Sequence, residues 1–86
     1  MKYAVGLVYN NKETNNNKYY IMWIEGNNVT VNWGRIDSNW QKKIFRHSTY
    51  EEAVKFINTK MKEKMKKGYW KWPIEKITAS NSKEYI

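Results

Sequence analysis

The chain has 86 residues, no cysteine, and 16 lysines and arginines against eight acidic residues, for a formal net charge of +8. This length accommodates one domain with a small core, and the lack of cysteine excludes disulfides, Cys-based zinc sites and thiol nucleophiles. The positive charge favours a polyanionic partner, although the abundance of Lys, Asn and Ile, typical of A+T-rich coding sequence, also raises the lysine content.

The first half of the chain predicts β-strands. Residues 3–9 alternate between two faces and predict a strand. Residues 10–18 contain no apolar side chain and predict a solvated loop. Residues 19–25 carry apolar side chains on both faces, so the strand here is expected to be central in its sheet. Residues 26–28 (Gly-Asn-Asn) predict a hairpin turn, because these residue types tolerate positive φ.

The third predicted strand begins at Val29 and contains Trp33. Val31 and Ile36 are five residues apart, so they would lie on opposite faces of a regular strand. A β-bulge just before Trp33 would return both to the core and would point Trp33 and Arg35 outward together. Without the bulge, Trp33 faces the core. The residues alone leave both arrangements open.

A turn at residues 37–39 leads to a fourth strand, 40–47, whose polar residues indicate a sheet edge. A helix is predicted over residues 50–67. Ser48 and Thr49 each precede a Glu by three residues, which provides a capping box in either register. The apolar stripe of the helix comprises Ala53, Val54, Ile57, Met61 and Met65, with Phe56 beside it, and the opposite face carries Lys55, Lys62 and Lys66.

The segment after the helix begins at Gly68, which predicts a C-terminal cap. The aromatic residues Tyr69, Trp70 and Trp72 are expected to close the core over the helix end, with room for one of them to be exposed. Residues 74–77 predict a weak strand and residues 80–86 a frayed tail. Together the elements predict one α+β domain, residues 1–86, in which a long amphipathic helix packs across a small antiparallel sheet of about four strands.

Catalytic and metal-binding chemistry find little support in the residues. The single histidine, His47, has no neighbours that complete a metal site and is expected to be a strand residue. The chain contains no Gly-rich phosphate loop and no Gly-x-Ser-x-Gly motif. Its apolar runs are far shorter than the ~20 residues of a membrane helix. We therefore expect a non-enzymatic, cytoplasmic protein with no cofactor, metal, small-molecule substrate or membrane partner.

Several pieces of the chain, taken in order, match a known family. They are Asn-Lys-Tyr-Tyr at 17–20, Val-Asn-Trp-Gly-Arg-Ile at 31–36, Gln41, Glu-Glu-Ala at 51–53, and Trp70 after the Lys-rich helix end. Through these pieces, residues 17–70 resemble the WGR domain, which is named for its Trp-Gly-Arg tripeptide. The chain departs from the family at Asn32, where a basic or bulky residue is frequent, and at Asp37, where glycine is common.

The resemblance implies a small antiparallel sheet with one packed helix, and it implies DNA binding. In DNA-damage-activated poly(ADP-ribose) polymerases, the domain contacts a DNA strand end. The resemblance assigns Trp33 to stacking on a sugar or base at the end, and Arg35 to DNA or a neighbouring domain. It places Asn17 and Lys18 near a terminal phosphate. The candidate nucleic-acid-binding residues are therefore Trp33, Arg35, Asn17, Lys18, Lys43 and Tyr69.

Two functions follow from these residues. The first is a DNA-binding module that favours strand ends or nicks, using Trp stacking and phosphate contacts from Lys and Arg. The alternative is a protein–protein interaction adaptor, or a small regulator or inhibitor, that uses the surface of Trp33 and Arg35. Trp and Arg are enriched at interface hot spots, which supports the alternative.

Overall fold

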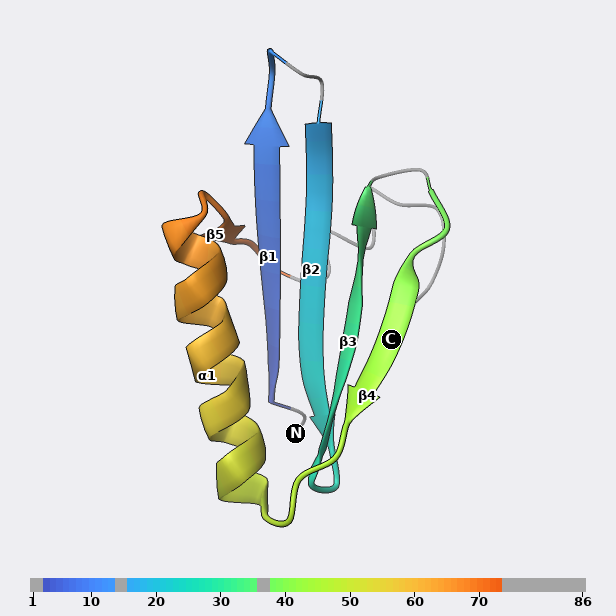
Figure 1. Cartoon of the computed structure of the whole chain (residues 1–86), viewed down its shortest axis with the longest axis vertical. Coiled ribbons are helices and arrows are strands. Elements are labelled where there is room, and N and C mark those ends of the chain that lie inside the picture. Colours follow the sequence, from blue (N-terminus) through green and yellow to red (C-terminus); the bar gives the residue numbers. More distant parts are fainter. Residues whose placement is uncertain (1–2, 14–15, 36–37, 74–86) are drawn as a thin grey trace.

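The computed structural model describes residues 3–13, 16–35 and 38–73 of the chain (Figure 1). In this part of the chain, antiparallel strands form one sheet with the order β4-β3-β2-β1-β5. The strands are β1 (Ala4–Asn11), β2 (Asn16–Glu25), β3 (Asn28–Arg35), β4 (Gln41–Phe45) and β5 (Trp70–Lys71). Helix α1 (Tyr50–Lys66) lies against one face of the sheet (Figure 1). The predicted α+β class is confirmed, with one short strand more than expected.

The main core lies between α1 and the sheet face that it covers. Ala53 and Ile57 of α1 are fully buried against alternate side chains of the three inner strands. These side chains are Val5, Leu7, Tyr20, Met22, Ile24, Val29 and Val31. Full burial of one large aliphatic side chain contributes about 1.5–3 kcal/mol, so this core holds α1 firmly along the sheet.

The opposite face of the sheet carries a second apolar cluster. Val8, Tyr19, Ile21 and Trp23 are buried there. Trp40 and Trp72 pack against this cluster from the loop before β4 and from the segment after β5. β2 is therefore apolar on both faces because both of its faces are covered, as predicted for a central strand.

The N-terminus of α1 is capped in one of the two registers that the sequence offers. Thr49 is the N-cap residue, and its Oγ1 accepts a hydrogen bond of 3.1 Å from the backbone N–H of Glu52. The Glu52 carboxylate accepts in return from the backbone N–H of Ser48, at 3.4 Å. The pair resembles a capping box, except that the carboxylate bonds to the residue before the N-cap, and it places the start of the helix at Tyr50.

The C-terminus of α1 ends in a Schellman motif that turns the chain back towards the sheet. Gly68 has a φ of 103°, and its N–H donates to the Met65 carbonyl at 3.1 Å. The N–H of Tyr69 donates to the Lys64 carbonyl at 3.1 Å. The aromatic segment then divides between the two sheet faces, because Tyr69 packs on the main core whereas Trp72 packs on the opposite cluster.

The structure decides between the two paths that the residues left open for β3. Its pairing with β2 runs without interruption from Glu25 opposite Asn28 to Lys18 opposite Arg35, so β3 has no bulge before Trp33 and the core-facing alternative is confirmed. Regular pairing leaves Trp33 on the same face as the core residues of β3. Residue 36, which motivated the bulge, lies outside the described residues.

Two predicted boundaries are also wrong. The loop at residues 10–18 is shorter, because Asn10 pairs with Asn17 and Asn11 with Asn16 in the β1–β2 ladder. Backbone hydrogen bonds extend this hairpin although its tip has no apolar face. His47 lies after β4 and not within it, with its ring 5.1 Å from that of Phe56. The edge position of β4 is confirmed.

The apolar stripe of α1 ends one turn earlier than predicted. Met65 is 44% exposed. Steps of four residues rotate by about 40° each around a helix, so Met65 is turned by about 80° from Ile57. The exposed face with Lys55, Lys62 and Lys66 is confirmed. The predicted strand at 74–77 and tail at 80–86 lie outside the described residues.

Within residues 3–13, 16–35 and 38–73, no helix is long and apolar enough to cross a membrane.

Candidate functional site

Three elements bring their ends together at one end of the molecule. In Figure 1, the beginning of β2, the end of β3 and the C-terminal end of α1 all lie towards the top of the view. There Lys18 is opposite Arg35 in the ladder, and Tyr20 is opposite Trp33. Directly opposed residues share a sheet face, and Tyr20 belongs to the core beneath α1. The two strands therefore present Lys18, Trp33 and Arg35 on the face that α1 covers.

Trp33 is half-buried and lines a cavity of about 280 Å³. Its ring centroid lies 6.4 Å from that of Tyr20, with the two planes at 36°, and the residue packs against the main core. The cavity is lined by Lys18, Tyr19, Tyr20, Trp33, Gly34, Arg35, Lys64 and Tyr69. Aromatic rings and cationic side chains thus line the same cavity. This combination suits a ligand that contains both a planar ring and an anionic group.

Lys64 lines this cavity from the last turns of α1 and is held by two rings. Its Nζ lies 4.6 Å from the ring centroid of Tyr20 and 5.4 Å from that of Tyr69. Burial lowers the pKa of Lys64, and the charges of Lys67 and Lys60 lower it further. Burial also raises the pKa of Tyr20 and the pKa of Tyr69. The cavity therefore contains a partly desolvated ammonium group whose charged form a bound anion would favour.

Gly34 allows Trp40 to approach the other side of β3. A Cβ atom at position 34 would lie 3.2 Å from Cδ1 of Trp40 and 3.4 Å from its Cα, and the φ of Gly34 is 154°. The Trp40 ring packs against Tyr19, with centroids 5.5 Å apart. In the tripeptide, Trp33 and Arg35 therefore lie on the cavity side of β3. Gly34 has no side chain, which leaves room for Trp40 on the other side of the strand.

The backbone at the end of β3 is fixed through one oxygen atom. The Arg35 carbonyl accepts hydrogen bonds from Nε1 of Trp40 at 3.0 Å, from the N–H of Ser38 at 3.3 Å and from Oγ of Ser38 at 2.6 Å. These bonds hold the strand end from which the exposed Arg35 side chain projects. Asp37, one of the two departures from the family pattern, lies outside the described residues.

A second hollow of about 310 Å³ adjoins the first. It is lined by Tyr9, Asn16, Lys18, Lys64, Lys67 and Tyr69. Lys18, Lys64 and Tyr69 line both hollows. Oδ1 of Asn16 is buried without a hydrogen-bond partner. An unsatisfied buried polar atom costs about 1–3 kcal/mol, so a ligand group that donates a hydrogen bond to this oxygen, such as a hydroxyl or an amino group, would recover part of that cost.

The structure brings together four of the six predicted site residues. Lys18, Trp33, Arg35 and Tyr69 line the cavity. Asn17 lies on the opposite face of β2, where its Oδ1 accepts a hydrogen bond of 2.8 Å from Nδ2 of Asn10. Lys43 lies on β4 opposite Val31, with its Nζ 5.0 Å from the ring centroid of Phe45. Neither Asn17 nor Lys43 lines either hollow.

Sequence analysis missed Asn16 and Lys64. Asn16 shares the face of Lys18 because the two are two residues apart on β2, but the predicted strand began only at Tyr19. Lys64 follows Ile57 by seven residues, which is about two helical turns, so it points in nearly the same direction as that core residue. The helical period therefore indicates that Lys64 faces the sheet. A lysine was not counted in the apolar stripe because its side chain is charged.

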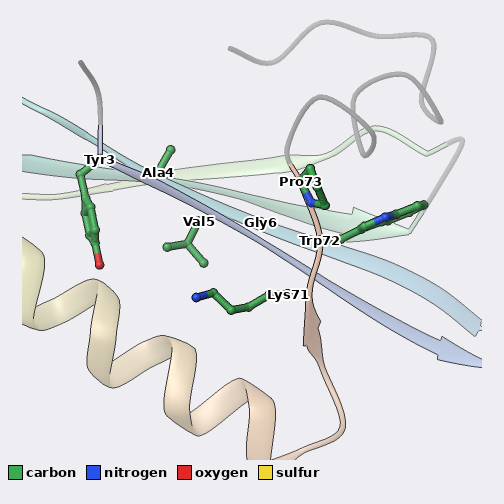
Figure 2. A pocket seen from close by; sticks show the side chains of 7 residues that line it. All are labelled: Tyr3, Ala4, Val5, Gly6, Lys71, Trp72 and Pro73. Atoms are coloured by element: carbon green, nitrogen blue, oxygen red, sulfur yellow. The ribbon is translucent and has the colours of Figure 1, made fainter.

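A larger cavity of about 420 Å³ lies beside the N-terminal half of β1 (Figure 2). Its lining residues are Tyr3, Ala4, Val5, Gly6, Lys71, Trp72 and Pro73. The hydroxyl group of Tyr3 points towards α1 and donates to Oδ1 of Asn58 at 2.8 Å. Lys71 is the one cationic side chain in this lining, and none of the predicted site residues belongs to it. The smaller cavity beside Trp33 is therefore the better candidate site.

Comparisons with known proteins agree with this architecture. The profile of a family described as WGR domain matches residues 3–76. A protein from Bacteroides fragilis with a known crystal structure has a similar fold, with a TM-score of 0.75 and 26% sequence identity. The match covers 85% of this chain and 20% of that one, so this chain spans about a fifth of that protein's length. No curated protein matches the sequence.

Proposed function

The chain belongs to the WGR domain family, and from this premise we propose that it binds DNA through the cavity beside Trp33, favouring strand ends or nicks. In the poly(ADP-ribose) polymerases that contain it, the WGR domain is a nucleic-acid-binding module and not a catalytic one. The observation that carries the proposal is the convergence of Trp33 with Lys18, Arg35 and Lys64 in one hollow.

Trp33 supplies the preference for ends. Inside a continuous duplex, each base pair is stacked on both sides, so a flat base face is open only at a terminus or a nick. An indole ring that meets such a face contributes about 1–3 kcal/mol. Packing against the core holds Trp33 in place, so little conformational entropy is lost when it stacks.

The cationic side chains supply affinity for the backbone of the strand. Arg35 offers a planar fork that matches two phosphate oxygens, whereas Lys18 and Lys64 act as point charges. We place a terminal phosphate in the adjoining hollow, where the ammonium groups of Lys64 and Lys67 are available to it. Each phosphate neutralised on duplex DNA releases counterions and steepens the dependence of binding on salt.

The test measures binding by fluorescence anisotropy to three DNAs of equal length: a 5′-phosphorylated duplex with an open end, the same duplex capped by hairpins at both ends, and a single strand. We expect the open end to bind most tightly, with a log–log salt slope of about −3 or steeper from three or more phosphate contacts. Equal weak binding to all three DNAs would remove the end-binding proposal. It would favour the protein-adaptor alternative, in which the Trp33 surface docks another protein.

A bound phosphate is expected to raise the pKa of Lys64. Its pKa is lowered in the free protein by burial and by neighbouring cations, and an adjacent anion favours the charged amine. Because the complex then holds the proton more tightly than the free protein, affinity should fall as pH rises through the pKa of free Lys64. Titration of the Lys64 Cε resonance by NMR, with and without DNA, checks this. An unchanged pKa for Lys64 on DNA binding would place the phosphate elsewhere.

A further inference from the structure

A second group of cations extends away from Lys64 along α1. Lys60 precedes Lys64 by one helical turn, and its Nζ lies 5.9 Å from the ring centroid of Phe56. The Phe56 ring packs against that of Phe45, with centroids 4.7 Å apart. Lys43 lies over the Phe45 ring at 5.0 Å. A pair of packed rings thus joins a lysine of α1 to a lysine of β4.

The part of this row on α1 adjoins the cavity. Lys64 lines the hollow beside Trp33, and it also lines a separate hollow of about 290 Å³ on α1. The lining of that second hollow is Lys60, Glu63, Lys64, Lys66 and Lys67. Lys60 and Lys64 are both half-buried, and each is positioned over an aromatic ring. Each ammonium group therefore lies beside an aromatic ring.

We propose that the DNA strand whose end lies at Trp33 continues over Lys64 towards Lys60 and Lys43, which contact its next phosphates. These three lysines form the cationic track. The inference rests on the proposed function, because the end at Trp33 sets where the strand starts. One helical turn is about 5.4 Å long and a DNA strand carries one phosphate per ~3.4 Å of axis, so Lys64 and Lys60 match phosphates one or two nucleotides apart.

One carboxylate lies beside the cationic track and would repel a phosphate there. Glu63 lines the same hollow, and its Oε2 lies 3.8 Å from Nζ of Lys60. An exposed ion pair of this kind contributes little, so a phosphate readily replaces the carboxylate as the partner of Lys60. Glu63→Gln is therefore expected to strengthen binding, by more than Glu51→Gln, which removes the same charge from the first turn of α1.

The test compares two charge-matched double variants. Lys43→Gln with Lys60→Gln removes two track cations, whereas Lys55→Gln with Lys62→Gln removes two cations from the exposed face of α1. For the track variant, we expect the log–log salt slope on the open-ended duplex to become shallower by about 2, with a loss of roughly tenfold or more in affinity near 0.1 M salt. The control should change the slope by less than half as much.

Strand length supplies the second readout. Wild-type affinity for 5′-phosphorylated single strands is expected to rise with each nucleotide up to about four, and the track variant should lose this rise. Equal effects of the two double variants, or full competition by polyglutamate, would reduce the track to general attraction and overturn the inference. If Trp33→Ala leaves the end preference intact while the track variant still changes the slope, the proposed end site fails instead. If the wild type binds no DNA, both fail.

Discussion

Replacing Trp33 with alanine is expected to weaken binding to an open duplex end by about 1–3 kcal/mol, or roughly 5- to 150-fold, because one base–aromatic contact is lost. Affinity for the hairpin-capped duplex should remain close to that of the wild type, since phosphate contacts do not involve the ring. Fluorescence anisotropy on the two DNAs measures the difference. Trp33→Phe retains a ring at the same place on β3 and is expected to restore most of the lost preference.

Trp70→Ala is the matched control for this prediction. Trp70 is 43% exposed and lies outside the lining of the cavity, so its loss removes a ring of the same kind without touching the proposed end site. Because Trp33 also packs on the core, Trp33→Ala should be less stable than the wild type. Binding is therefore measured well below the unfolding temperature of Trp33→Ala. An equal loss of end preference in the two variants would show that Trp33 has no particular role.

Replacing Gly34 with alanine is expected to lower the free energy of unfolding by about 2–4 kcal/mol. A non-glycine residue in a rarely populated backbone region costs about 1–3 kcal/mol, and crowding of the new Cβ against Trp40 adds about 1 kcal/mol or more. The crowded atom is Cδ1 of Trp40, at 3.2 Å, and the hydrogen bond from Nε1 of Trp40 to the Arg35 carbonyl limits how far the indole can move away. Urea unfolding at constant pH and salt measures the loss.

Gly26→Ala separates the two causes. Gly26 has a φ of 64° in the β2–β3 turn, but a Cβ there meets no atom within 4 Å. Its substitution should therefore show backbone strain alone, at about 1–2 kcal/mol. If Gly34→Ala costs no more than Gly26→Ala, the approach of Trp40 does not explain the glycine of the tripeptide.

Much of the fold could be predicted because the relevant signals are local. Alternation along β2, the Thr49 N-cap and Gly68 at the helix end all depend on residues close together in the sequence. The errors arose where longer-range contacts decide. Strand β5 is two residues long and exists because Trp70 and Lys71 pair with Val8 and Leu7. No pattern in two residues could predict that pairing.

The candidate site was predicted less completely because it lies between elements. The tripeptide identified Trp33 and Arg35, and the cavity contains both. The choice between an outward and a core-facing Trp33 depended on register, and unbroken pairing with β2 decides it in favour of the core face. Lys64 lies in the site because the last turns of α1 are packed close to Tyr20. Packing determines this position of the helix, and no local pattern predicts it. Such a contact has no signature within either segment.

Because positive charges are close together around Lys64, salt is expected to have opposite effects on the stability of the free protein and on its affinity for DNA. Lys67, Lys60 and Lys18 all disfavour its charged form, so like charges repel one another within the folded state. Salt near 1 M reduces the Debye length to about 3 Å and relieves this repulsion, which stabilises the free fold. The same salt removes the attraction for phosphate and weakens the complex. If the cavity binds DNA as proposed, the repulsion that lowers the stability of the free fold is relieved when phosphates of the strand occupy the site.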